Sequence, residues 1–563
     1  MYLRSTKRKN GDGSVVEYLQ LAENNWDSAK GCAVAKVVHN FGRADELDQE
    51  SLKRLAKSIL RVFPGEEQLA LEPGVKVLGA WSYGVIHVVE SIWRELEVPN
   101  VIAELSHKHR VKQPFERACF AMVANRLHDP SSKLRCFEHW LPEEVIIPGT
   151  EDLALENVYR GMDFWEAHKE KIEEAVYFKM ADMMSADVDL VFYDTTSLHC
   201  EIDLEDELEA IGNEAAGSKK YEALRRRGYS KNGRSDAPQI VVGMAVTRDG
   251  LPVRSWVFPG NTSDVSTIEK IKADLKGWRL GRCVFVGDAG MNSEENRHTL
   301  SLGGGKYILA SKMRSGDEVT KKVLTRGGRY HEVAGNLQVK EVFVGKGERR
   351  RRYVVCFNPQ ELERQRTHRA QVLRMLTEEL STLRKPKPGA NQSQKINELL
   401  TSKRFGKYLR QTKRGLLKID KAALVKAEKY DGKWVVTSND DTLTPEDLAL
   451  GYKQLMRVEE AWRSMKSGLS TRPMFHWTAH RICAHVSLCV MSLLIERIAE
   501  IRGKETWRNI RDELGQIKIV EYERNEIRIR QTTEIRSHAK ELLKKLGIDQ
   551  PPKIHLIPTK NKI

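Results

Sequence analysis

The sequence predicts a multidomain α+β protein whose centre is a mixed α/β sheet with helices, interrupted by a β-rich insertion. Short β-branched runs alternate with amphipathic runs between residues 186 and 313, a pattern typical of such a sheet. The alternation stops at residue 314, and helical periodicity returns at Pro445, so the segment between them is expected to be an insertion. A chain of 563 residues has room for about three or four structural units.

The first quarter of the chain is expected to form a small α+β module. Residues 14–23 and 33–43 are predicted to be two strands joined by a polar turn at Asn24 and Asn25. A helix is expected from about Leu47 to Val62, and several amphipathic helices are expected within 83–141.

The central part is predicted to contain five short strands, with helices before the last two. The expected strands are 188–194, 239–247, 251–258, 283–287 and 306–311. The second and third are separated by Arg248-Asp249-Gly250, and Asp-Gly is a strong signal for a tight hairpin. Three strands in series, then helix, strand, helix and strand, is the order of a ribonuclease-H-like core. Other mixed α/β domains share this order.

Within the insertion, strands are expected near 339–345, 352–357 and 433–438, with a long charged helix at about 359–383. The arginine run 349–352 either contacts a DNA backbone or is a charged hairpin tip in water. The last residues of the chain are polar and basic and are expected to be helical. The expected domains are 1–112, a helical connector 113–185, a split core 186–313 with 445–502, the insertion 314–444, and a basic tail 503–563.

The composition favours a polyanionic partner and a reducing compartment. The formal net charge is +15, and cations that neutralise phosphates release counterions, although an ordinary basic protein is the alternative. The eight cysteines form no C-x-x-C pair, so neither a zinc knuckle nor a disulfide framework is indicated. The amino terminus lacks the apolar segment of a signal peptide, and the apolar stretch 482–495 is shorter than a bilayer span. We therefore expect a cytoplasmic protein with no membrane partner.

Two aspartates stand directly after predicted strands, Asp194 and Asp288. Neighbouring strand ends meet at one edge of a sheet, and two adjacent carboxylates repel unless a cation neutralises them. Carboxylate oxygens suit Mg²⁺ or Mn²⁺ better than zinc. Taken alone, each aspartate is as well explained by a turn or a helix cap.

A third carboxylate lies in the run YKQLMRVEEAWRSMKSGL, which begins at Tyr452. On one continuous helix, Tyr452, Glu459, Arg463 and Lys466 would share a face. That face would present a metal-binding carboxylate beside two cations able to bind phosphate. An exposed helix with a Glu459–Arg463 ion pair is the alternative.

The segments DTT (194–196), VGDAGM (286–291) and Y-x6-E-x6-K resemble those of the DDE transposases of bacterial and archaeal insertion sequences. The chain is most similar to insertion-sequence family four, whose members carry a β-rich insertion before the glutamate helix. Three further matching phrases are GYSKNGRSDAPQIVVGMAVTRDGLP (228–252), PGNTSD (259–264) and RVEEAWRSMKSGLSTRPMFHW (457–477).

The resemblance implies a catalytic and metal-binding triad of Asp194, Asp288 and Glu459 that holds two Mg²⁺ or Mn²⁺ ions. It also implies cut-and-paste transposition, with DNA as partner in the form of terminal inverted repeats and target DNA. A homodimer on DNA and a nucleoid-associated location are expected, and residues 1–112 would help to recognise the element's ends. A metal-dependent nuclease of the same fold and a domesticated DNA-binding protein are the competing interpretations.

The resemblance also suggests which residues contact DNA. Tyr452 and Lys466 match the family's tyrosine and lysine, but Leu455 stands where the family has an arginine. Arg457 and Arg463 are the neighbouring cations that we assign to DNA binding. Trp434 and Trp462 are expected to pack in the core, with stacking on a flipped base as the alternative.

Overall fold

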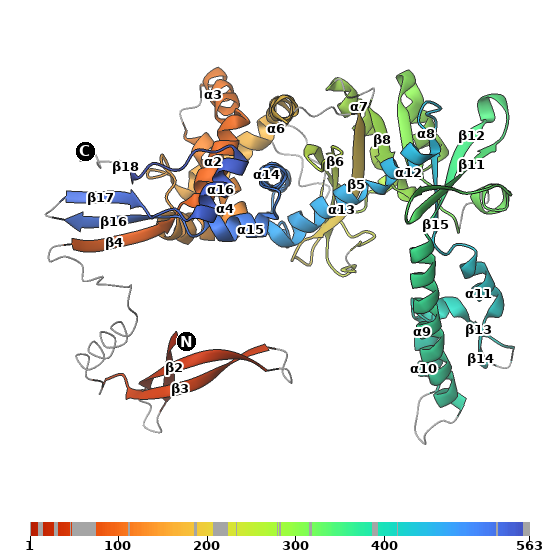
Figure 1. Cartoon of the computed structure of the whole chain (residues 1–563), viewed down its shortest axis with the longest axis horizontal. Helices are drawn as coiled ribbons and strands as arrows, with labels where there is room; N and C mark the ends of the chain where they lie inside the picture. Colours follow the sequence, from red (N-terminus) through yellow and green to blue (C-terminus); the bar gives the residue numbers. More distant parts are fainter. Residues whose placement is uncertain are drawn as a thin grey trace. The chain divides into compact units, whose positions relative to one another are not determined.

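The computed structural model describes residues 2–9, 15–27, 32–45, 47, 75–110, 113–184, 189–206, 223–231, 233–278, 280, 283–314, 318–384, 392–413, 415–524 and 527–555 (Figure 1). The chain divides into two compact units. The smaller comprises Met1–Leu78 with Tyr522–Ile529, and the larger comprises Gly79–Glu521 with Arg530–Ile563.

The smaller unit contains an antiparallel sheet of three strands, β1 (Tyr2–Lys9), β2 (Val15–Asp27) and β3 (Cys32–Arg43). The two predicted strands are confirmed, but the predicted turn is wrong. Asn24 and Asn25 lie inside β2, where they pair with Ala35 and Val34, because backbone pairing continues past the apolar part of the strand. The strand β1 was not predicted because its basic sequence carries no apolar face. The helix expected at 47–62 lies outside the described residues, apart from Leu47 itself.

The larger unit is organised around one sheet of nine strands, in the order β10-β11-β12-β15-β9-β8-β5-β6-β7. Its core strands are β5 (Leu190–His199), β6 (Gln239–Val246), β7 (Pro252–Pro259), β8 (Val284–Gly287) and β9 (Lys306–Ala310). The first three are antiparallel, β8 is parallel to β5, and β9 is parallel to β8. This is the ribonuclease-H-like arrangement that the order of predicted elements indicated.

Helices connect these strands where the sequence predicted them. The short 3-10 helix η3 (Asp264–Thr267) and helix α7 (Ile268–Gly277) precede β8, and α8 (Glu294–Ser301) precedes β9. The hairpin between β6 and β7 is confirmed. Its turn requires Gly250, whose φ of +79° is a left-handed conformation that glycine adopts without strain.

The strands of the insertion continue the core sheet and do not form a sheet of their own. They are β10 (His331–Ala334), β11 (Leu337–Val344), β12 (Arg351–Phe357) and β15 (Lys433–Ser438). The junction is the antiparallel pairing of β15 with β9, in which Val436 lies opposite Ala310. The sequence could not reveal this junction, because strand pairing between distant segments leaves no local signal.

The rest of the insertion is a helical part with a small apolar core of its own around Val372 and Leu376. It consists of α9 (Pro359–Arg384), α10 (Gln392–Thr401), the short strands β13 (Leu409–Gln411) and β14 (Leu417–Ile419), and α11 (Lys421–Glu428). Arg369 and Asp431 form a buried ion pair beside this core.

The arginine run of the insertion is divided between an exposed turn and the strand β12. Arg352 is buried and pairs with Glu341 at 2.6 Å. Arg351 pairs with Glu294 at 2.6 Å and with Glu318 at 2.7 Å. Both alternatives considered from the sequence, DNA contact and a tip in water, are therefore wrong for Arg352, whereas Arg349 and Arg350 are exposed in the turn between β11 and β12.

A helical region packs beside the core sheet. It contains α2 (Gly84–Glu95), α3 (Val98–Lys108), α4 (Phe115–His128), α5 (Lys133–Arg135), the π-helix η1 (Cys136–Glu144), α6 (Leu155–Met183), α14 (Ala479–Gly503), α15 (Trp507–Leu514) and α16 (Ser537–Leu546). Helix α14 contacts α4, α6 and β7. It is longer than the apolar stretch predicted from the sequence, and its length and composition alone would allow it to cross a membrane. However, 94% of its most apolar window is buried inside the protein, so it is a core helix.

The carboxy-terminal region is not wholly helical, which corrects the expectation from the sequence. It contributes β16 (Lys518–Arg524), β17 (Ile527–Thr532) and β18 (Ile554–His555) to a four-stranded sheet that also includes β4 (Val75–Ser82). The segment IRIRQT of β17 begins with apolar and basic residues in alternation, a strand pattern with a period of two, whereas KIVEYER of β16 lacks this alternation and buries Glu521.

Candidate active site

The sheet register places Asp194 next to Asp288. The parallel pairing of β5 with β8 ends at Tyr193 and Gly287, and each aspartate is the following residue on its strand. Asp194 is not at a strand end, as the sequence suggested, because β5 continues to His199 through its pairing with β6. The two carboxylates nevertheless lie at one edge of the β5–β8 pair, as predicted.

Asp288 also caps a short helix. Its Oδ1 accepts a hydrogen bond of 2.6 Å from the backbone N–H of Ala289, where the 3-10 helix η5 (Ala289–Met291) begins. The cap and ligand interpretations are compatible, because a carboxylate has two oxygens with about four lone-pair positions. The side chain is exposed to solvent.

Glu459 reaches this edge from the second of three successive helical segments, which stand in place of the single predicted helix. These are α12 (Pro445–Lys453), α13 (Met456–Arg463) and the π-helix η10 (Ser464–Gly468). The single continuous helix predicted over this run is therefore wrong, because the chain turns at Gln454 and Leu455 between α12 and α13. Helix α13 packs on β5 and β6 and carries Glu459 in its first turn.

Tyr452 connects the three carboxylates. Burial raises the pKa of its hydroxyl, and the negative charges of Asp288, Glu459 and Asp194 raise it further. All three carboxylates are thus close enough to Tyr452 to act on its charge, even though the tyrosine and Glu459 lie on different helices.

Two further charged residues belong to this edge, and the sequence analysis assigned no role to either. Lys231 Nζ lies 3.1 Å from Asp264 Oδ2 and 3.9 Å from Asp194 Oδ1. It also donates hydrogen bonds to the backbone oxygen of Thr195 at 2.8 Å and to its hydroxyl at 2.7 Å. The Thr195 hydroxyl in turn donates to Asp264. The sequence contains only an indirect indication of a role for these two residues, since Lys231 and Asp264 stand in two of the phrases that carry the family resemblance.

The electrostatics of the edge reflect burial opposed by ion pairing. Burial raises the pKa of Asp194 to about 6, and the charges of Asp288 and Asp264 add to this rise, whereas Lys231 opposes it. Burial lowers the pKa of Lys466 to about 8, and the nearby charge of Arg472 contributes. The Lys466 ammonium donates a hydrogen bond of 2.5 Å to the Thr196 hydroxyl, next to Asp194 on β5.

The remaining predicted DNA contacts lie in different places. Arg463 is exposed one helical turn beyond Glu459, and the described residues show no ion pair between the two, so the alternative of an ion-paired surface helix has no support. The structure does not bring Arg457 to the carboxylates. It pairs with Glu460 at 3.0 Å and lies beside Gly250, in the β6–β7 turn that adjoins the amino-terminal end of β5.

The two tryptophans that were weighed as base-stacking residues pack in the interior. Trp462 is buried, and Trp434 is partly buried against the main core, as expected from the sequence. Large aromatic side chains that are exposed instead include Tyr229, Phe475 and Trp477.

The donor set fits a hard divalent cation bound in an open site. Among the described residues, no three His, Cys, Asp or Glu side chains lie close enough together to enclose a metal ion. Mg²⁺ does not need such a cage, because it usually keeps several waters and binds through one or two carboxylates plus phosphate oxygens. The solvent-accessible carboxylates of Asp194 on β5, Asp288 directly after β8 and Glu459 on α13 match that requirement.

Two family models match the chain. "IS1634 family transposase, N-terminal domain" matches residues 3–68, and "Transposase DDE domain" matches residues 200–495, which is more than half of the chain. The second match includes Asp288 and Glu459 and begins after Asp194. A transposase DDE domain implies a DNA partner and dependence on divalent metal ions.

A comparison with curated protein sequences finds no match. Among solved structures, the chain is similar to one described as "Cryo-EM structure of piggyBac transposase synaptic complex with hairpin DNA". The identity is 10%, the alignment covers 77% of this chain and 78% of that chain, and the TM-score is 0.34, a level that supports no inference. On the two family matches, the chain belongs to the DDE transposase family and is a DNA transposase of an insertion sequence.

Proposed function

We propose that Asp194, Asp288 and Glu459 are the catalytic metal ligands and that they hold two Mg²⁺ or Mn²⁺ ions during cut-and-paste transposition. The observation that carries this proposal is the placement of the three carboxylates around Tyr452 at one edge of the sheet. Bound in this way, the ions would activate the attacking hydroxyl and stabilise the leaving oxygen of the phosphodiester. Hydrolysis at the element's ends would come first, and strand transfer into target DNA would follow at the same site.

The cations of the edge would then contact the DNA. Lys466, held on Thr196 next to Asp194, is placed to neutralise charge that develops on the scissile phosphate. Arg463 is exposed on the same helix as Glu459 and can reach a neighbouring phosphate. Tyr452 would hold the phosphate or a ligand water through its hydroxyl, which burial keeps protonated. We do not assign this role to Arg457, because it pairs with Glu460 away from the carboxylates.

Recognition of the element's ends is proposed for the amino-terminal residues 1–112. The support is that the match to an IS1634 transposase N-terminal domain, over residues 3–68, falls inside this segment. Two ends must be brought together before they are joined to a target, so we expect a homodimer on DNA. In the cell such a protein would associate with the nucleoid.

The test is cleavage of a DNA fragment that carries the terminal repeats flanking the gene, with Mg²⁺ or with EDTA. Asp194→Asn, Asp288→Asn and Glu459→Gln are each expected to abolish cleavage and to leave binding of the fragment unchanged. Glu460→Gln is the matched control, because Glu460 follows Glu459 directly but pairs with Arg457. Cutting at a near wild-type rate by a triad variant would remove that residue from the assignment.

The same assay separates the competing functions. Joining of the cut ends to a target plasmid is expected of the transposase and not of a simple nuclease. Specific binding by the wild-type protein without cutting in either Mg²⁺ or Mn²⁺ would indicate a repurposed DNA-binding copy, and the catalytic proposal would be wrong.

A further inference from the structure

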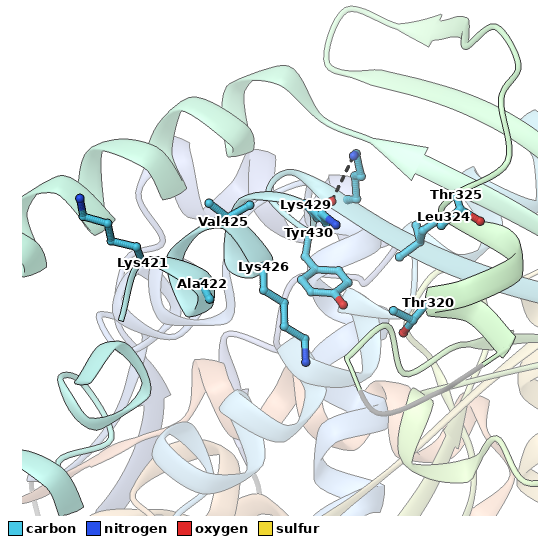
Figure 2. A pocket seen from close by; sticks show the side chains of 10 residues that line it. Thr320, Leu324, Thr325, Lys421, Ala422, Val425, Lys426, Lys429 and Tyr430 are labelled. Carbon is cyan, nitrogen blue, oxygen red and sulfur yellow. Dashed lines mark hydrogen bonds between the residues drawn. The ribbon is translucent and has the colours of Figure 1, made fainter. Parts of the chain in front are cut away.

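A basic groove lies in the insertion, formed by helix α11, the following turn and the π-helix η7 (Val319–Val323) (Figure 2). Its cavity volume is about 930 Å³. Four lysines line it, and none of its lining residues is acidic: Lys421, Lys426, Lys429 and Lys433. Figure 2 shows the first three of these around Tyr430 and Val425, and Val425 is 58% exposed. We call this surface the lysine groove.

The sheet topology places the lysine groove at the same edge as the carboxylates. Strand β9 is parallel to β8, so it ends at the edge where Asp288 follows β8. Strand β15 is antiparallel to β9, so its first residue, Lys433, lies at that edge as well. Helix α11 leads directly into β15 through Tyr430, which is buried. The groove is therefore separated from Asp288 by two steps between neighbouring strands.

Exposed cations also occupy the intervening position on this edge. Lys312 and Arg314 come two and four residues after the end of β9, and both side chains are exposed. The Arg314 guanidinium lies 5.8 Å from the centre of the Tyr430 ring, on the wall of the groove. Among the described residues, none of the lysines of the groove forms an ion pair with a carboxylate. A row of cations thus extends from the strand beside Asp288 to α11.

We propose that the lysine groove binds the phosphate backbone of the same DNA whose scissile phosphate lies at Asp194 and Asp288. This inference rests on the proposed function and assigns a second contact to the same substrate. Neighbouring strands are about 4.8 Å apart, and Lys433 lies three residues along β15 from Val436, which is level with Asp288, so the groove begins about 14 Å from Asp288. Duplex DNA rises about 3.4 Å per nucleotide of one strand, so the contact lies at least about four nucleotides from the scissile phosphate.

The spacing of the lysines suits a run of phosphates. Residues 421 to 429 extend along about 12 Å of helix, a length that covers about three nucleotides of one DNA strand. The contact is independent of base sequence, because lysine acts as a point charge toward phosphate. An apolar wall at Val425 and Tyr430 accommodates the sugars between the phosphates.

The test compares two full-length variants with the same change in charge. The groove variant carries Lys421→Gln, Lys426→Gln and Lys429→Gln. The control carries Lys403→Gln, Lys413→Gln and Lys418→Gln, which are exposed lysines of the same insertion that do not line the groove. Binding to a duplex of arbitrary sequence is measured by fluorescence anisotropy between about 50 and 200 mM salt. Each lost phosphate contact lowers the salt slope by about 1, so the groove variant is expected to lose about 3 and the control to keep the wild-type slope.

A second measurement locates the contact. A duplex carrying the terminal repeat is shortened stepwise on each side of the cleavage position. On one side, shortening the duplex to within about four nucleotides of the cleavage position is expected to remove the difference in affinity between the wild type and the groove variant.

The outcomes separate this inference from the proposed function. If the wild type binds and cuts but the groove variant keeps its salt slope, or if both variants lose it equally, the groove assignment is wrong. If the wild type neither binds nor cuts the duplex, the proposed function is wrong, and the groove assignment, which rests on it, is wrong as well.

Discussion

The Lys231 ammonium occupies a position from which it opposes a metal ion at Asp194. Its Nζ lies 3.9 Å from Asp194 Oδ1, and two hydrogen bonds to Thr195 and the ion pair with Asp264 hold it there. A divalent cation binds a carboxylate oxygen at about 2.1 Å, which places it about 5 Å from this ammonium. We therefore expect Lys231→Met to tighten divalent metal binding to the full-length protein in the absence of DNA.

The expected magnitude follows from Coulomb's law. Charges of one and two units about 5 Å apart repel by about 1.5 kcal/mol even at the dielectric constant of water, which is roughly a tenfold change in Kd. A lower dielectric constant at this partly buried site increases the effect, so about tenfold is the lower bound. The loss of Lys231 also removes an influence that lowers the pKa of Asp194, which is about 6 in the wild type. The comparison is therefore made at about pH 8.5, where this carboxyl is ionised.

The assay is a titration with Mn²⁺ followed by electron paramagnetic resonance of the free ion. Lys231→Arg is the matched control, because it keeps the positive charge, and its Kd for Mn²⁺ is expected to stay close to the wild-type value. A Kd for the Met variant that is unchanged or weaker would refute the reasoning, since removal of a nearby positive charge cannot then have relieved any repulsion.

Three further predictions concern the framework of the site. Burial raises the pKa of Glu496 from 4.5 to about 7, so folding loses stability as the pH rises from 4.5 through 7. Glu496→Gln should leave urea stability unchanged at about pH 4 and raise it by up to about 3 kcal/mol at about pH 8. Arg369→Met leaves the buried Asp431 unpaired and should destabilise the insertion by about 3 to 5 kcal/mol, measured by hydrogen exchange, whereas the double variant with Asp431→Leu should recover most of the loss. A Cβ at Gly260 would lie 1.9 Å from the Gln239 carbonyl oxygen, so Gly260→Ala should lower Tm and cleavage together, whereas Gly277→Ala, with no atom within 4 Å, should change neither.

The core of the fold could be predicted because its signals are local. The strands β6, β8 and β9 are short apolar runs, β5 begins with the apolar run Leu190–Tyr193, and the hairpin at Gly250 is specified by its Asp-Gly dipeptide. The junction of β15 with β9 could not be predicted, because it joins segments that are far apart in the sequence and depends only on backbone hydrogen bonds. The strands β16 and β17 were missed for a different reason, since charged and polar residues make up most of each strand.

The candidate site was predictable in its residues but less so in its geometry. The sequence predicted that Asp194 and Asp288 meet at one sheet edge, and the register places them next to each other. The helix face that was expected to align Tyr452 with Glu459 does not exist, because the chain turns between α12 and α13, and tertiary packing places both residues at the edge instead. Lys231 and Asp264 were not identified because a lysine in a turn and an aspartate at the start of a short 3-10 helix carry no periodic signal.

The sheet that joins the insertion to the core limits how this enzyme can be shortened. Removal of residues 314–444 would take away β15 and leave β9, whose residues 307–310 are buried, as an open sheet border with unsatisfied backbone groups. Such a border is a template for pairing with other chains, so a truncated enzyme should aggregate and should not be a smaller active transposase. A workable reduction would keep the four strands and replace only the helical part between β12 and β15 with a short turn.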